Sequence, residues 1–171
     1  KMTAYHEAGH ALVAWEMPRI DPIHRISIVS RGMSLGHTMT EPIDRVHETK
    51  SHLLEEISMM LGGQAAERLV FDDITTGASN DLEQATQVAR AMVMKFGMSE
   101  LGPVTLDLQK ETPYDSNEIS PDMQSKVDEQ VKKIIDNAFA NSTRILKKLR
   151  RKLDLLAEEL LKKETLESEE F

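Results

Sequence analysis

Five consecutive residues near the start of the chain combine two metal-binding side chains with a base. Residues 6–10 read His-Glu-Ala-Gly-His. On a helix, His6 and His10 would lie one turn apart on the same face, where two imidazoles can bind one zinc ion. Glu7 would follow one residue around the helix, within reach of a water molecule on that metal. The pentapeptide therefore indicates a zinc hydrolase.

The alternative is a surface helix that carries two solvated histidines. The chain has 6 His in 171 residues, and a shuffled sequence of this composition would contain the H-E-x-x-H pattern roughly one time in fifty. The hydrolase is favoured because the residues around the pattern also have helical periodicity.

The third ligand of such a site has several candidates. A catalytic zinc ion usually has three protein ligands and an open position for water. The chain contains no cysteine, so the third ligand must be Asp, Glu or another histidine. His47 and His52 lie in polar sequence and are predicted to be exposed. His24 and His37 flank a predicted hairpin and are better placed, but Asp81 is the strongest candidate on local grounds.

Asp81 follows a short polar loop, residues 74–80, and begins a predicted helix. A short carboxylate at that point would project from a fixed position and could reach a metal. In the structural alternative, Asn80 caps the helix and Glu83 reaches back to the cap. The negative charge of Asp81 then only stabilises the positive N-terminal end of the helix dipole. The local sequence supports these two interpretations equally.

Overall composition limits the class of protein. With 171 residues, of which 40% are hydrophobic, the chain can form one domain with a proper core. Lys and Arg number 21 against 29 Asp and Glu, and this net charge of −8 argues against nucleic-acid binding. We find no run of eighteen apolar residues and no signal peptide. Because the first helix starts almost at once, we expect a piece of a longer protein.

Hydrophobic periodicity predicts the elements that must position these side chains. Helices are predicted for residues 1–17, 48–71, 81–97 and 121 onward, with a break near 150–151. Strands are predicted for 25–30 and 36–40, a loop for 102–120, and a last turn from Thr165. Gly62 and Gly63 inside the second helix indicate either a close approach of another helix or a kink. The fold class is therefore mainly α with a small β-hairpin.

Several segments in the right order resemble a known family. They are residues 5–11 (YHEAGHA), 21–28 (DPIHRISI), 61–67 (LGGQAAE), 75–82 (TTGASNDL), 95–99 (KFGMS) and 101–103 (LGP). Together they resemble the peptidase domain of the FtsH family of membrane-anchored, ATP-dependent AAA zinc metalloproteases. The resemblance covers most of residues 1–105 and continues more loosely through the helical tail.

The resemblance implies a single peptidase domain of the Asp-zincin type over residues 1–171. Its catalytic core with the zinc site would span 1–105, followed by a loop at 106–120 and a helical C-terminal part at 121–171.

The resemblance also implies the roles of the site residues. One Zn²⁺ per chain would be bound by His6, His10 and Asp81, and Glu7 would be the catalytic base. This favours the ligand interpretation of Asp81 over the capping one.

A substrate site follows from the same resemblance. The strand after the first turn would lie beside the active site and could pair with an extended substrate by strand addition. Its residues are Gly36, His37, Thr38, Met39 and Thr40.

The implied activity is that of a zinc metalloendopeptidase of the EC 3.4.24 type, which hydrolyses unfolded or membrane proteins. Its AAA ATPase module and transmembrane segments would lie elsewhere in the full-length chain, and the protein would form a homo-hexamer. The full-length protein would be membrane-anchored, with the peptidase domain on the cytoplasmic side of a bacterial inner membrane or, alternatively, in an organellar membrane. We expect this fragment itself to be soluble.

Two alternatives and several departures accompany this assignment. The domain could be a catalytically silent part that assembles the hexamer, or it could enclose a purely structural zinc ion; the intact Glu7 argues against the silent form. The chain has no G-x-x-x-x-G-K-[ST] loop, so it carries no ATPase. Gln64 and Arg68 differ from the usual family residues, and segment 106–121 is shorter than usual.

Overall fold

Amphipathic segments of the sequence form six α-helices in the parts of the chain that the computed structural model describes, which are residues 1–29, 37–40, 46–106 and 119–170. The helices are α1 (Met2–Glu16), α2 (Lys50–Met60), α3 (Gly62–Phe71), α4 (Ser79–Met94), α5 (Pro121–Lys148) and α6 (Arg150–Lys163). The strands are β1 (Ile23–Ser27), β2 (His37–Thr40) and β3 (Thr165–Glu167), and the one-turn 3-10 helices are η1 (Thr76–Ala78) and η2 (Ser168–Glu170). This arrangement confirms the predicted mainly α fold.

Side-chain caps mark the start of two of the described helices, α2 and α5. Ser120 caps α5 by accepting a hydrogen bond from Met123 N, and Pro121 occupies the first turn, where it needs no backbone donor. Leu149 separates α5 from α6, which confirms the predicted break. The helix predicted for 48–71 is in fact two helices, α2 and α3, which meet at Leu61.

The predicted hairpin is confirmed. β2 pairs with β1 in antiparallel register, with Ile26 opposite Thr38 and Ser27 opposite His37. β1 covers Ile23–Ser27 rather than 25–30. Gly36, which we predicted to begin the second strand, lies outside the described residues.

The turn predicted at Thr165 is wrong, because Thr165–Glu167 forms β3 on the other side of β1. The sheet order is therefore β2-β1-β3. Leu166 lies opposite Ile26, and both side chains are buried in the core. Three residues leave little local signal, and the pairing depends on a strand that lies far away in the sequence.

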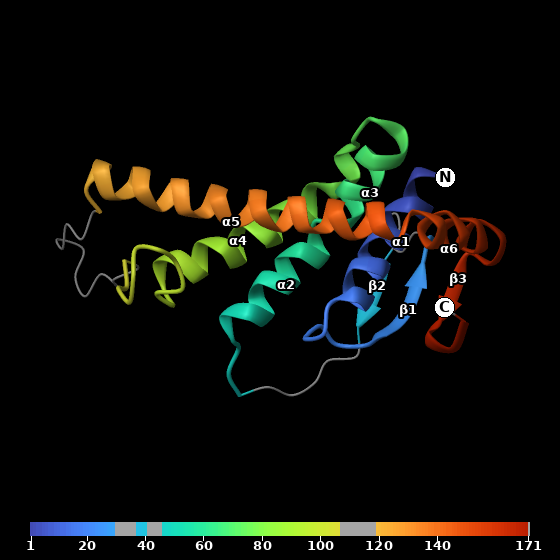
Figure 1. Cartoon of the computed structure of the whole chain (residues 1–171), viewed down its shortest axis with the longest axis horizontal. Coiled ribbons are helices and arrows are strands. Elements are labelled where there is room, and N and C mark those ends of the chain that lie inside the picture. Colours follow the sequence, from blue (N-terminus) through green and yellow to red (C-terminus); the bar gives the residue numbers. More distant parts are fainter. Residues whose placement is uncertain (30–36, 41–45, 107–118, 171) are drawn as a thin grey trace.

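The helices and strands drawn in Figure 1 enclose a core that consists of two groups of buried side chains. The α1 cluster joins α1, β1, α3, α6, β3 and the end of α5, and includes Leu12, Val13, Ile26, Ala66, Leu146, Leu153, Leu160 and Leu166. The α4 cluster joins α2, α4 and the first part of α5, and includes Leu53, Ile57, Leu61, Ala85, Met92, Val93, Val127 and Val131. Helix α5 runs along both clusters, and Phe139 on α5 packs against each of them.

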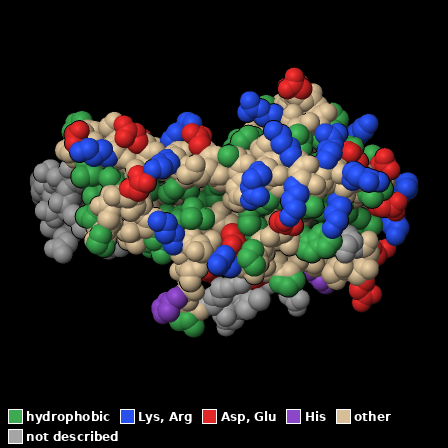
Figure 2. All heavy atoms as spheres, in the orientation of Figure 1, with side chains coloured by type: hydrophobic (Ala, Val, Ile, Leu, Met, Phe, Trp, Pro, Cys, Tyr) green, Lys and Arg blue, Asp and Glu red, His purple; other side chains and the backbone are tan. Residues whose placement is uncertain are grey.

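Charged side chains cover the outside of this architecture. Figure 2 shows Lys and Arg side chains gathered over the region where α5 passes into α6. Lys147, Lys148, Arg151 and Lys152 are exposed there. Among the helices that the structure describes, none combines the length and the apolar composition needed to cross a bilayer.

Candidate metal centre

Three potential ligand atoms from two helices meet at one point. His6 Nε2 lies 3.1 Å from Asp81 Oδ2, and His10 Nε2 lies 3.3 Å from the same oxygen. The two Nε2 atoms are 3.0 Å apart. Helix α1 places both histidines on its buried face, and the first turn of α4 carries Asp81 to them. The structure thus brings His6, His10 and Asp81 together, and their role as metal ligands stays a prediction.

The other histidine candidates do not share this position. Within the described part of the chain, the group of side chains that could hold a metal consists of His6, His10 and Asp81, with all ligand atoms within 4.8 Å of one another. His24, His47 and His52 do not belong to it.

The hydrogen bonds behind the two histidines define their orientation. His10 Nδ1–H donates to the Met59 carbonyl oxygen at 2.8 Å, and His6 Nδ1–H donates to Glu67 Oε1 at 2.8 Å. These partners assign the imidazole hydrogens to Nδ1, so each neutral ring directs the lone pair of its Nε2 toward Asp81. Two lone pairs and a carboxylate oxygen about 3 Å apart repel one another unless a cation or a proton lies between them. This donor set fits zinc, for which imidazole nitrogen and carboxylate oxygen are usual ligands.

Burial and neighbouring charges have opposite effects on the pKa values of His6 and Asp81. Burial lowers the pKa of His6, but the hydrogen bond that its protonated ring would donate to Asp81, the charge of Glu7 and the hydrogen bond to Glu67 outweigh burial and raise the pKa above its ordinary value. Burial would raise the pKa of Asp81, yet the hydrogen bonds that protonated His10 and His6 would donate to its carboxylate hold that pKa far below its usual range. The cluster therefore attracts positive charge, which a divalent cation can supply.

Glu67 on α3 supports the cluster from behind, although we had not assigned it a role from the sequence. The residue is only 2% exposed, and its carboxylate accepts hydrogen bonds from Thr75 N (2.7 Å) and Thr75 Oγ1 (3.2 Å) as well as from His6. Thr75 precedes η1, which leads into the turn of α4 that carries Asp81. One signal was available: Glu67 lies four residues after Gly63, on the buried side of its helix.

The paired glycines allow α1 and α3 to approach at the cluster. A Cβ atom on Gly9 would lie 2.4 Å from the Gly62 carbonyl oxygen, and one on Gly62 would lie 2.8 Å from the Gly9 carbonyl oxygen. A Cβ atom on Gly63 would lie 2.5 Å from His6 Nε2 and 2.6 Å from His10 Nε2. Close helix approach thus explains these glycines, and the break at Leu61 shows that the helix is interrupted as well.

Glu7 lies on α1 beside the cluster and is only 5% exposed. Its Oε2 accepts a hydrogen bond of 2.9 Å from Thr38 Oγ1 on β2. The predicted substrate strand therefore lies against the helix that carries the predicted base. Gly36 and the side chains of His37, Met39 and Thr40 lie outside the described part of the structure.

Comparison with known proteins identifies the family. The family model described as "Peptidase family M41" matches residues 1–171. The chain belongs to peptidase family M41. The M41 chain is 44% identical over 180 residues to the "ATP-dependent zinc metalloprotease FtsH" of Thermotoga maritima, covering 100% of this chain and 30% of the relative.

Two further relatives carry the same name. The protein of Thermus thermophilus is 42% identical over 175 residues, which cover 100% of this M41 chain and 28% of the relative. The protein of Rhodococcus erythropolis is 42% identical over 174 residues, which cover 97% of this chain and 20% of the relative. The M41 chain thus spans less than a third of the length of these relatives.

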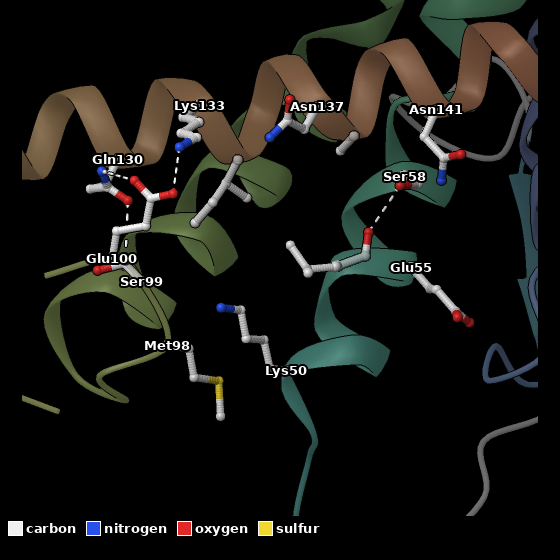
Figure 3. Close-up of a pocket in the computed structure, with 13 residues that line it drawn as sticks. Lys50, Glu55, Ser58, Met98, Ser99, Glu100, Gln130, Lys133, Asn137 and Asn141 are labelled. Atoms are coloured by element: carbon white, nitrogen blue, oxygen red, sulfur yellow. Dashed lines mark hydrogen bonds and ion pairs between the residues drawn. The ribbon is translucent and has the colours of Figure 1, made fainter. Parts of the chain in front are cut away.

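A hollow of about 400 Å³ lies elsewhere on the M41 chain, between α2, α5 and the turn after α4 (Figure 3). We call it the α2–α5 groove. Glu100 closes one end, where its carboxylate pairs with Lys133 and its backbone N donates to Gln130 Oε1 at 3.2 Å. The residues that line the groove do not include His6, His10 or Asp81, so this hollow is separate from the candidate metal centre.

Proposed function

We propose that this M41 chain is the zinc-dependent peptidase part of a longer ATP-dependent protease and that it hydrolyses internal peptide bonds. The observation that carries the proposal is the convergence of His6, His10 and Asp81 beside Glu7. Membership of a peptidase family and relatives named zinc metalloproteases support it.

In this proposal His6, His10 and Asp81 hold one Zn²⁺ per chain and are its three protein ligands, an arrangement typical of catalytic zinc. When bound, zinc lowers the pKa of a coordinated water to about 7 and polarises a carbonyl group. Glu67 and the Met59 carbonyl keep the two imidazoles turned toward the cluster, because each accepts the hydrogen of an Nδ1 atom.

Glu7 is the general base of the proposed reaction. Its carboxylate takes a proton from the attacking water and then gives it to the amine that leaves from the broken peptide bond. The position of Glu7, one residue after His6 on the buried side of α1, supports this role.

We assign substrate binding to residues Gly36, His37, Thr38, Met39 and Thr40. Among the described strands, β2 pairs only with β1, so one of its edges is left for another strand. The backbone N–H and C=O groups of an edge can pair with an extended polypeptide. A folded substrate cannot present such a segment, which favours unfolded proteins as substrates.

The remainder of the proposed protein follows from the relatives. Because the chain spans less than a third of their length and their names include "ATP-dependent", we propose a AAA ATPase module and transmembrane segments in the rest of the full-length chain. We also propose a homo-hexamer, membrane anchoring, and a peptidase domain on the cytoplasmic side of a bacterial inner membrane. Unfolded membrane proteins would then be among the substrates.

The test compares zinc content with casein hydrolysis in three variants. Glu7→Gln should keep one zinc ion per chain and lose hydrolysis, and Asp81→Ala should lose both. Asp122→Ala is the matched control, because Asp122 also lies in the first turn of a helix but far from the cluster in sequence, on α5; it should keep both.

Two results would overturn the assignment. Hydrolysis by Glu7→Gln at the parental rate would remove Glu7 as the base, and stoichiometric zinc in Asp81→Ala would remove Asp81 as a ligand. A parental chain that binds one zinc ion but cleaves neither casein nor short peptides would favour the silent assembly domain.

A further inference from the structure

The carboxylate of Glu7 has one hydrogen-bond donor among the residues that the structure describes. This donor is the hydroxyl group of Thr38, which lies 2.9 Å from Glu7 Oε2 and 3.3 Å from the main-chain oxygen of Glu7. A hydroxyl group has a single hydrogen, and the shorter distance directs it to the negatively charged carboxylate. Thr38 thus bonds one oxygen of the carboxylate and leaves Oε1 for another partner.

The position of Thr38 is itself well determined. Its backbone lies opposite Ile26 in the sheet, and Ile26 is fully buried between α1 and the other strands. Threonine is also restricted in χ1, because its Cβ carries two heavy atoms. The sheet therefore fixes the hydroxyl group, which in turn fixes a glutamate side chain with three rotatable bonds.

We propose that Thr38 is a positioning residue, whose hydroxyl group holds the Glu7 carboxylate in the orientation required for proton transfer. The inference rests on the proposed function, in which Glu7 is the base. Proton transfer depends steeply on geometry, and a displacement of about 1 Å can lower a rate by about a hundredfold. Thr38 thereby acts on the chemical step from within the strand that we assign to the substrate.

A purely structural role is the main competing explanation. The same hydroxyl group joins β2 to α1, so its loss could displace the strand and weaken substrate binding. The two explanations differ in the kinetic constant that changes: a displaced strand raises KM, whereas a misoriented base lowers kcat.

The experiment measures steady-state hydrolysis of a fluorogenic peptide by the zinc-loaded chain. Thr38→Val, which removes the hydroxyl group but keeps the β-branch, should lower kcat by about tenfold to a hundredfold and leave KM within about twofold. Thr38→Ser, which keeps the hydroxyl group, should restore most of kcat. Thr38→Ala is a second variant without the hydroxyl group, for use if Thr38→Val does not fold.

Thr165→Val is the matched control. Thr165 lies on β3, at the opposite side of the same sheet, and its hydroxyl group lies 2.9 Å from Ser27 Oγ. The same substitution there should leave kcat and KM at parental values.

A second readout uses the interaction between the two residues. In a Glu7→Gln background, Thr38→Val should change the residual rate by less than about twofold, because no base remains to be positioned.

A third readout is the binding of a peptide hydroxamate, measured by calorimetry. Binding should weaken in Thr38→Val and recover in Thr38→Ser, since the hydroxyl group of the hydroxamate needs a carboxylate in a fixed position.

Each outcome has one consequence. A parental kcat in a folded, zinc-loaded Thr38→Val or Thr38→Ala chain overturns the inference, and so does a raised KM with unchanged kcat. A loss of kcat that Thr38→Ser does not restore also overturns it. If the parental chain shows no zinc-dependent cleavage, both the proposed function and the inference about Thr38 are wrong. If the parental chain is active and Thr38→Val has parental kcat and KM, only the inference about Thr38 is wrong.

Discussion

The α1 cluster and the α4 cluster contribute unequally to the metal centre. The first supplies both histidines and Glu7 from a single helix, and its α1 and α3 approach so closely that Gly9 and Gly62 have no room for side chains. The second supplies only Asp81, and its outer side is hollowed by the α2–α5 groove, where the exposed Glu100–Lys133 ion pair joins α5 to the turn after α4. Two ligands are thus fixed by tight packing of one region, while the third depends on how the two regions meet.

The side chain of Glu67 connects the α1 cluster to the segment that places Asp81 through hydrogen bonds. Glu67 on α3 bonds both His6 and Thr75, and Thr75 begins the segment that leads to Asp81. The Glu67 carboxylate therefore orients His6, a candidate ligand from the α1 cluster. It also fixes Thr75, which precedes the turn that places Asp81, the candidate ligand from the α4 cluster. Changes at the α1–α3 contact should therefore lower zinc affinity more than changes at the groove.

The largest effect is expected from Gly63→Ala. The added methyl group would lie 2.5 Å from His6 Nε2 and 2.6 Å from His10 Nε2, so both imidazoles must move. We expect zinc affinity to fall by more than about a hundredfold, measured by competition with a chelator. Gly77→Ala is the control, since its Cβ would meet only the Thr75 hydroxyl oxygen, at 3.2 Å. Parental affinity in Gly63→Ala would contradict the described packing.

Zinc should stabilise the fold because its ligands come from both regions. At a free zinc concentration one hundred times the Kd, binding to the native state alone adds about 2.7 kcal/mol to the free energy of unfolding. Calorimetric melting with and without chelator should show this gain in the parental chain and lose it in Asp81→Ala. An equal gain in both chains would mean that zinc binds without the second region.

Glu67→Gln is expected to have a smaller effect on zinc. The amide oxygen can still accept the hydrogen bond from His6 Nδ1. The side chain has lost its charge, however, and its NH₂ group cannot accept the hydrogen bond that Thr75 N donates to the second carboxylate oxygen. Supporting residues of this kind typically change metal affinity by about tenfold to a hundredfold, and we expect a value near the lower limit. Chelator competition measures it, and an unchanged affinity would show that the link through Glu67 is not needed.

The smallest effect is expected at the groove. Glu100→Gln removes the charge that pairs with Lys133 on the surface, and such pairs contribute about 0–1 kcal/mol. Zinc affinity should remain parental, and chemical denaturation should show a loss of no more than about 0.5 kcal/mol. A loss of zinc affinity comparable with that of Glu67→Gln would remove the distinction between the two regions.

Hydrophobic periodicity was sufficient to predict most helices, although residues 4–14 of α1 are buried on every side. The start of α5 follows from Ser120 and Pro121, and the break at Leu149 was predicted from the length of the periodic segment. β3 could not be predicted in this way, because Leu166 becomes a strand residue only through its pairing with β1.

The candidate site shows the same limit. The spacing of His6 and His10 predicts that they face one point, because one helix carries both. Local sequence left Asp81 undecided between ligand and helix-dipole roles, and the geometry brings it to the histidines across the boundary between the two clusters. Glu67 escaped prediction for the same reason, since its partners His6 and Thr75 come from different elements.

The most direct test of the central claim is the anomalous scattering of a zinc-loaded crystal of this chain, measured on both sides of the zinc absorption edge. We predict one zinc peak per chain, about 2.0–2.2 Å from Nε2 of His6, Nε2 of His10 and a carboxylate oxygen of Asp81. A peak bound by the two histidines without Asp81, or one located elsewhere, would contradict a metal centre assembled from both regions.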